Sequence, residues 1–213
     1  MNKRVFLMLA AALVALMASV VYADKISDLQ KKAESGDAEA QFELARAYAE
    51  GGERKRDLAE MGNDLALALD SINQDYVKSA EWLQKAAEQG FDEAQYMLGC
   101  CYIAGLGVEK DYVKVMEWTR KAAEHGYAPA QNNLGCFYER GGYGVPQDMN
   151  KAFEWFLKAA EQGNPDSQFT VGRFYARGIG IEKNLIKAME WYQKSADQGC
   201  TRAVDLLLKF SAL

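Results

Sequence analysis

The chain has 213 residues and carries 30 acidic against 25 basic side chains, a formal net charge of −5 at pH 7. A chain of that charge is a poor partner for nucleic acid or for an anionic membrane surface, so neither class of ligand is expected. With 49% hydrophobic residues and only three prolines, the composition predicts a helical protein with a substantial core.

The first 23 residues predict a secretory signal peptide. Lys3 and Arg4 precede a long apolar run, and Val21, Tyr22 and Ala23 form a small-residue cleavage site. The chain is therefore expected to be exported, to a periplasmic or secreted location, with no membrane span left after cleavage. An uncleaved membrane anchor is the alternative, because the apolar run approaches the length that crosses a bilayer.

A ten-residue pattern, EWLQKAAEQG at residues 81–90, returns three times with small changes. Its tryptophans step by 36, 37 and 36 residues, at Trp82, Trp118, Trp155 and Trp191. A fixed period of this length predicts a stack of helical repeats and not a closed globule. The expected divisions are a cap helix over 24–35, repeats over 36–89, 90–125, 126–162 and 163–198, and a C-terminal cap over 199–213.

The first repeat is longer than the others because of an insertion at residues 51–71. Its 18 extra residues make about five helical turns, so lengthening both helices of one hairpin would keep the apolar stripes in phase. Gly51 and Gly52 argue against a first helix that runs unbroken through them. The apolar residues of the insertion favour a packed helical segment over a mobile surface loop: Leu58, Met61, Leu65, Leu67, Leu69 and Ile72.

Each later repeat predicts two helices, marked by polar and glycine residues. Side chains that cap a helix N-terminus stand before the second helices, at Asp75, Asp111, Asp148 and Asn184. Glycines suited to left-handed backbone close these helices, at Gly90, Gly126, Gly163 and Gly199. Inside the first helices glycine costs about 1 kcal/mol relative to alanine. Its recurrence there predicts close helix contacts at Gly99, Gly135 and Gly172.

Few residues carry chemistry beyond packing. The cysteines, Cys100, Cys101, Cys136 and Cys200, have no disulfide or zinc spacing and are expected to be free thiols, with a Cys101 to Cys136 bridge as the alternative. The single histidine, His125, stands where sister repeats have glutamine and is expected to be exposed near a helix end. No catalytic triad, phosphate loop or metal motif is present, so neither an enzyme nor a cofactor is expected.

The repeated elements Tyr-x-x-Gly-x-Gly-Val, Lys-Ala-x-x-Trp and Lys-Ala-Ala-Glu-x-Gly resemble the Sel-like repeat (SLR) family, relatives of tetratricopeptide repeats. The resemblance implies an all-α, right-handed α-solenoid of about four helix-turn-helix repeats with terminal half-repeat caps. It also implies a monomeric scaffold that binds a protein or peptide partner. Cysteine-rich relatives have been described as hydrolysing β-lactams, which makes a hydrolase the alternative function, although this chain lacks their regular cysteine pair per repeat.

In such arrays the first helices line a concave groove, and residues off their packing stripe point into it. The groove residues expected on this basis are Phe42, Arg46, Glu50, Tyr96, Cys100, Ile103, Asn132, Cys136, Glu139, Arg140, Phe169, Arg173 and Arg177. Three of them, Arg140, Arg173 and Arg177, are expected to hold a carboxylate or an acidic peptide. The repeated tryptophans are expected on the buried stripe of the second helices, where they would serve stability.

Overall fold

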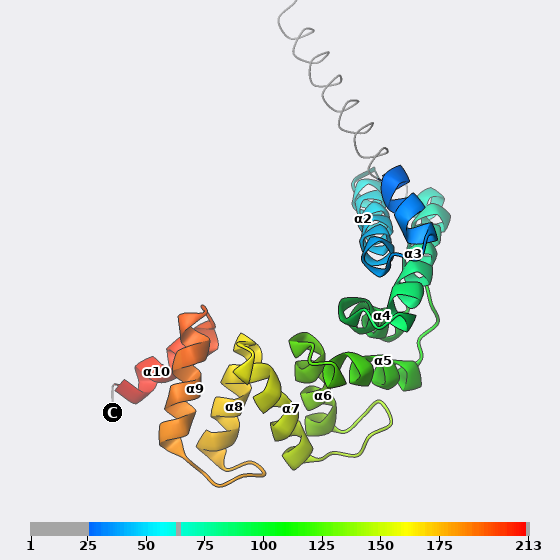
Figure 1. The fold of residues 1–213 in the computed structure, drawn as a ribbon. Helices are drawn as coiled ribbons and strands as arrows, with labels where there is room; N and C mark the ends of the chain where they lie inside the picture. The colour runs from blue at the N-terminus through cyan, green and yellow to red at the C-terminus, as the bar shows by residue number, and fades with distance from the viewer. Residues whose placement is uncertain (1–25, 63–64, 212–213) are drawn as a thin grey trace, which may run out of the picture. The chain divides into compact units, whose positions relative to one another are not determined.

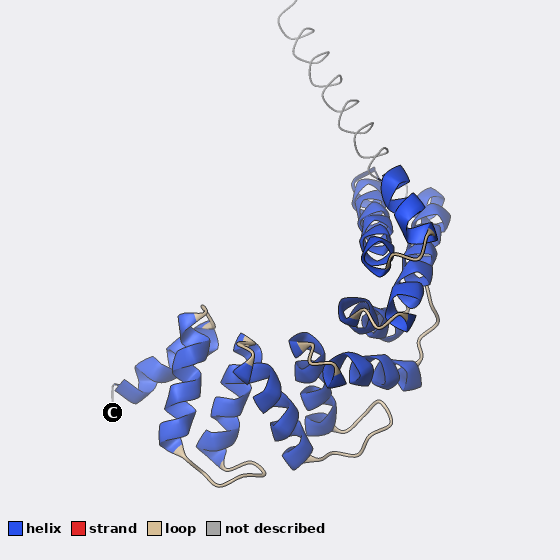
Figure 2. Ribbon diagram, viewed as in Figure 1, coloured by secondary structure: helices blue, strands red, loops and turns tan. Residues whose placement is uncertain are grey.

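The computed structural model describes residues 26–62 and 65–211, and within these ranges the chain is helical (Figures 1 and 2). Gly142 and Val145 form an isolated antiparallel β-bridge in the loop between two of the helices. The all-α solenoid predicted from the sequence is confirmed. The expected signal peptide, residues 1–23, lies outside the described residues. The chain divides into two units, Met1–Phe91 and Asp92–Leu213, which are considered in turn.

The first unit consists of a helix over residues 26–34 and a long hairpin, α2 (Ala38–Gly62) and α3 (Leu65–Glu88). Its core contains Ala33, Ala40 and Leu44, with Tyr48 and Trp82 packed against them. The insertion therefore lengthens both helices of one hairpin. The packing predicted for apolar residues around Leu58 and Met61 concerns side chains outside the described part of the chain.

Two expectations for this hairpin are wrong. Helix α2 runs unbroken through Gly51 and Gly52. The missing side chain at Gly52 lets α3 approach closely, since a Cβ there would lie only 3.3 Å from the ring of Tyr76. Asp75 caps no helix, because α3 begins at Leu65 and Asp75 lies in its interior. Its carboxylate pairs instead with Lys55 of α2, at 2.6 Å.

The second unit stacks three helix pairs and one further helix. The pairs are α4 (Asp92–Ala104) with α5 (Tyr112–Glu124), α6 (Ala128–Arg140) with α7 (Met149–Glu161), and α8 (Pro165–Arg177) with α9 (Leu185–Asp197), followed by α10 (Thr201–Ser211). Each second helix also packs against the first helix of the next repeat (Figure 1).

The predicted helix ends of the second unit are confirmed. The side chains of Asp111, Asp148 and Asn184 accept hydrogen bonds from backbone N–H groups in the first turns of α5, α7 and α9. The glycines expected after the second helices have positive φ, for example +99° at Gly126 and +95° at Gly163. These local devices define where each helix begins and ends.

The recurring glycines of the first helices admit the second helix of the same repeat, as predicted. A Cβ on Gly135 would lie 2.8 Å from the Phe156 ring, and one on Gly172 would lie 2.7 Å from the Tyr192 ring. On α10 the same register position holds Leu208, whose side chain is 63% exposed. The glycine position is therefore matched to a large residue on the facing helix.

The tryptophans are less buried than expected. Trp118 is 7% exposed, but Trp155 and Trp191 are only half-buried, and the deeply buried side chain is the next residue, Phe156 or Tyr192. The ammonium group of the lysine three residues later lies over each indole ring. In one case Lys158 Nζ is 4.0 Å from the centroid of the Trp155 ring. Trp155 and Trp191 therefore lie at the edge of the core.

Glutamine pairs join the two helices of three repeats. In one, the side chain of Gln131 donates to the Ala123 carbonyl at 3.1 Å and accepts from Gln162 at 2.7 Å. The same pattern links Gln41 with Gln89 and Gln168 with Gln198. His125 stands in the place of the second glutamine. It is exposed, as expected, and contacts Asp92 with Nδ1 at 2.7 Å.

Candidate partner-binding pocket

First helices of successive repeats lie side by side in the second unit and are joined by polar contacts. Between α6 and α8 the Ser167 hydroxyl donates to Asn132 at 2.7 Å. Between α8 and α10 the Arg202 guanidinium donates to Asp166 at 2.6 Å. These contacts align three helices along one face.

A pocket of about 340 Å³ opens between these three helices. Its lining residues are Asn132, Cys136, Glu139 and Arg140 of α6, Phe156 of α7, Asp166, Phe169, Thr170 and Arg173 of α8, and Arg202 of α10. From Asn132 to Arg140 the lining follows α6 for about 12 Å, at 1.5 Å per residue. A volume of that size lies at the lower end of the range for ligand sites.

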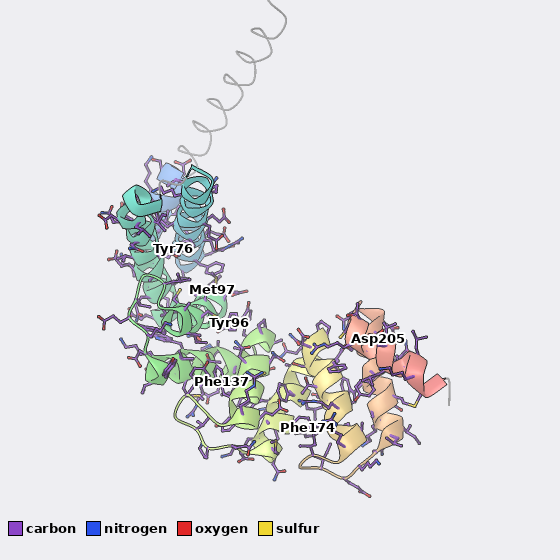
Figure 3. The ribbon with its side chains drawn as sticks, turned by 180° about the vertical axis from the view of Figure 1, so that it is seen from behind. Tyr76, Tyr96, Met97, Phe137, Phe174 and Asp205 are labelled. Atoms are coloured by element: carbon purple, nitrogen blue, oxygen red, sulfur yellow. The ribbon has the colours of Figure 1, made fainter. Side chains whose placement is uncertain are left out.

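Two aromatic side chains form the apolar part of the pocket. Phe156 is 1% exposed and also packs against Phe174, which Figure 3 labels on α8. Phe169 is half-buried, with Tyr192 5.5 Å away between ring centroids. The guanidinium of Arg202 lies 4.6 Å from the Phe169 centroid. The pocket therefore has rigid aromatic walls, one of them covered by a cation.

Most of the charges in the pocket are already paired. Arg173 donates to Glu139 at 2.5 Å, and both side chains are largely buried. Arg202 is held by Asp166. No ion pair involves Arg140 within residues 26–62 and 65–211, and its side chain is exposed at the end of α6. Three arginines face two carboxylates, so the pocket carries a net positive charge in an acidic chain.

Cys136 is the thiol that lines the pocket. Burial raises its pKa, with a further rise from Glu139 and a partial opposing effect of Arg140 and Arg173. The thiol is therefore protonated at neutral pH and contributes a small, weakly polar surface. All four cysteines are free, as expected.

The structure brings six of the thirteen predicted groove residues into this pocket: Asn132, Cys136, Glu139, Arg140, Phe169 and Arg173. Arg173 is not available as predicted, because Glu139 already occupies its guanidinium. Arg177 is exposed at the end of α8 and does not line the pocket.

The remaining predicted residues lie elsewhere. Tyr96 and Cys100 are half-buried on α4, where the Tyr96 ring packs against Tyr127 and the Tyr96 hydroxyl accepts a 3.4 Å hydrogen bond from the Asn133 side chain. Burial, together with Cys100, raises the pKa of Tyr96. Ile103 is half-buried on the same helix.

The other three belong to α2 in the first unit. There the rings of Phe42 and Phe91 pack in a tilted arrangement with centroids 5.0 Å apart, and Arg46 pairs with Glu43 at 3.0 Å and with Glu50 at 4.0 Å. These contacts are local to α2 and its neighbourhood, so the first unit contributes nothing to the pocket.

Sequence reasoning missed four lining residues, Phe156, Asp166, Thr170 and Arg202. The register could have indicated Arg202, since it holds on α10 the place of Asp166 on α8. Phe156 lies in the core, and it also lines the pocket. Within the described residues there is no group of three or more His, Cys, Asp or Glu side chains able to hold a metal ion.

Comparison with known sequences gives five matches to the Sel1 repeat, over residues 38–62, 58–91, 92–127, 128–164 and 165–200. Two of these fall within the first long repeat. No curated protein matches the chain. None of the described helices is long and apolar enough to cross a membrane.

Two solved structures share the fold with more than 30% sequence identity to this chain. One is a protective antigen of uropathogenic Escherichia coli with an SLR fold, at 37% identity and a TM-score of 0.69, covering 85% of this chain and 35% of that one. The other is a Sel1 repeat protein from Oxalobacter formigenes, at 34% identity and a TM-score of 0.72, covering 87% and 48%. The chain thus spans a third to a half of the length of these relatives.

Proposed function

The chain belongs to the Sel1 repeat family, and from that premise we propose that it is an exported binding module that holds a segment of a protein partner in the pocket between α6, α8 and α10. It acts by binding and not by catalysis.

The observation that carries this proposal is the convergence of varying residues on one pocket. One position of the first helices, where the second helix packs closely, holds the same residue in three repeats: Gly99, Gly135 and Gly172. Neighbouring positions change: Asn132 corresponds to Tyr96 and to Phe169, and Cys136 corresponds to Cys100 but also to Arg173. Variation at pocket-lining positions of a scaffold whose glycine positions are kept suits recognition of a particular partner.

The scaffold favours binding because it is ordered before the partner arrives. Helix α8, which lines the pocket, has a capped N-terminus: the Asn164 side chain accepts a hydrogen bond from the Ser167 N–H at 2.9 Å. The Glu139–Arg173 pair fixes two long side chains in place. Pre-organised side chains lose less conformational entropy on association, so more of the contact energy remains as affinity.

A capture experiment with a filled pocket tests the proposal. Thr170→Trp places a large side chain inside the pocket, and Val113→Trp places the same side chain on α5 where the residue is 75% exposed. The exported fraction of the source cells is passed over each immobilised variant and over the parent. We expect one partner to be lost with Thr170→Trp and retained with Val113→Trp. Equal capture by both variants, with unchanged melting, would show that the pocket is not the binding site.

Export is proposed from the sequence of residues 1–23 and needs its own experiment. The chain is produced in a bacterium with an intact secretion pathway, and the N-terminus of the protein outside the cytoplasm is sequenced. Cleavage after Ala23 predicts Asp24 as the first residue. An N-terminus that still begins at Met1, in a membrane fraction, would instead support the uncleaved anchor.

A further inference from the structure

The charges in the pocket define what its occupant must carry. Arg173 and Arg202 are neutralised by Glu139 and Asp166, which leaves the charge of Arg140 without a carboxylate in the described part of the chain. A guanidinium offers several donors in a fork that matches a carboxylate. The pocket therefore provides for one acidic group. It does not suit a run of acidic groups, because its other two arginines are already paired and the chain as a whole is negatively charged.

The apolar walls require a second feature of the occupant. The exposed part of Phe169 offers aromatic surface in the same pocket as Arg140, whereas Phe156 is 1% exposed and offers almost none. Covering this surface removes apolar area from water, which favours an aliphatic or aromatic side chain on the ligand. The occupant thus combines a carboxylate with an apolar group.

The distribution of polar groups indicates how the ligand runs. Asn132, Asp166 and Arg202 lie toward the beginnings of the helices, whereas Glu139, Arg140 and Arg173 lie toward their ends. Polar groups at both ends suit a chain that passes along the pocket, because they lie near its peptide groups at either end. At about 3.3 Å per extended residue, the 12 Å length of the lining holds three or four residues.

From these observations we propose that the pocket binds an extended peptide segment with one aspartate or glutamate on Arg140 and a neighbouring apolar side chain against Phe169. The inference rests on the proposed function and names the chemistry of its ligand.

Three pentapeptides test the proposal by titration calorimetry. The first is acetylated and amidated at its ends and contains one glutamate beside leucine; the second has glutamine in place of glutamate; the third lacks glutamate and ends in leucine with a free carboxylate. We expect the first to bind and the second to bind about tenfold more weakly or worse, since hydrogen bonds to charged groups are the stronger ones.

Matched variants tie the effect to one residue. Arg140→Gln should weaken the glutamate peptide to the level of the glutamine peptide. Arg177→Gln should leave its affinity unchanged, because Arg177 holds the same place at the end of α8, is exposed and lies outside the pocket. The peptide should also slow alkylation of Cys136 but not of Cys100, which has the same register position on α4.

The other outcomes overturn the proposal. Equal binding of the glutamate and glutamine peptides, equal losses in both arginine variants, or no binding of any peptide at millimolar concentration would exclude an acidic side chain on Arg140. Tighter, Arg140-dependent binding of the third peptide would assign the site to a chain terminus. If Arg140→Gln still captures the partner that Thr170→Trp loses, the ligand chemistry is wrong and the binding function stands.

Discussion

At the scale of single residues, the glutamine pairs show how buried polar side chains contribute to the array. Gln131 is 5% exposed, yet its amide donates to the Ala123 carbonyl and accepts from Gln162. A buried polar group that loses its partner costs more than an average hydrogen bond contributes. The pairs therefore stabilise each repeat only as long as both glutamines are present.

Replacing Gln131 with alanine should lower the free energy of unfolding by about 1 to 3 kcal/mol, because the Ala123 carbonyl loses its donor in a buried place. Gln162→Ala removes the exposed partner and should cost about 1 kcal/mol. Because the two side chains interact directly, the double variant should cost less than the sum of the two. Urea unfolding of the four proteins measures this, and strictly additive losses would contradict the interaction.

The four thiols should react in an order set by their pKa values. Burial raises the pKa of Cys101 to about 11. For Cys200, burial raises the pKa, but hydrogen bonds from Ser195, the Ala203 N–H and Arg202 outweigh it and lower the pKa below its usual value. The thiolate is the reactive form, so a lower pKa gives more of it at a given pH.

As pH rises from about 7, iodoacetamide should therefore label Cys200 first and Cys101 last. Mass spectrometry of peptides from the labelled protein, sampled across the pH range, gives the order. Labelling of Cys101 at neutral pH as fast as that of Cys200 would contradict the burial of Cys101.

At the scale of helices, the contact between α6 and α7 depends on a glycine facing a phenylalanine. Gly135→Ala would place a methyl group 2.8 Å from the ring of Phe156, which is 1% exposed. Overpacking of this kind costs about 1 to 3 kcal/mol, more than the helix propensity of alanine returns. Gly99→Ala is the control, because its Cβ would lie 3.1 Å from the smaller Thr119 and should cost less. Thermal melting of both variants measures the difference, and equal losses would show that the ring is not the obstacle.

Two adjacent aromatic residues on α7 should differ in how much their replacement lowers the free energy of unfolding. Phe156→Ala should cost about 3 to 5 kcal/mol, because it removes a fully buried ring. Trp155→Ala should cost about 1 to 2 kcal/mol, because the half-buried indole gives up less area and its contact with Lys158 is exposed. Chemical unfolding compares the two, and a larger loss for Trp155 would restore the original prediction that the tryptophans dominate the core.

These helices also show what could be predicted from the sequence. Asp111, Asp148 and Asn184 were recognised as caps because capping depends on a few neighbouring residues. Asp75 has the same sequence position but fails as a cap, because the 18 extra residues extend α3 in front of it. Trp155 and Phe156 lie about 100° apart around the helix, so periodicity places the apolar stripe but does not decide which of two large neighbours is buried deeper.

At the scale of the molecule, the proposed binding role predicts that the chain does not hydrolyse β-lactams. The single histidine, His125, is exposed and contacts Asp92. Burial raises the pKa of Cys100, Cys101 and Cys136, so these thiols are poor nucleophiles at neutral pH. We expect the purified chain to leave a chromogenic β-lactam intact over hours. Turnover that survives purification and disappears in a cysteine variant would contradict a pure binding role.

The candidate site was predicted in part, for reasons that belong to this scale. Register along the repeat identified Asn132, Cys136 and Arg140, because equivalent residues of parallel first helices face the same way. The pairing of Glu139 with Arg173 depends on side-chain conformations that a repeat pattern does not contain. Arg202 was missed because it lies on the capping helix, which was considered only as an end to the stack.

Leu208 has a consequence for how such an array can grow by gene duplication. A second helix laid against α10 as α7 lies against α6 would meet a leucine side chain where Phe156 meets only a glycine. A duplicated repeat inserted ahead of α10, between existing repeats, keeps a glycine at this position, whereas a second helix packed on α10 in the same way would need a smaller residue at 208. New pockets of different chemistry would then arise inside the array, each between two inherited neighbours.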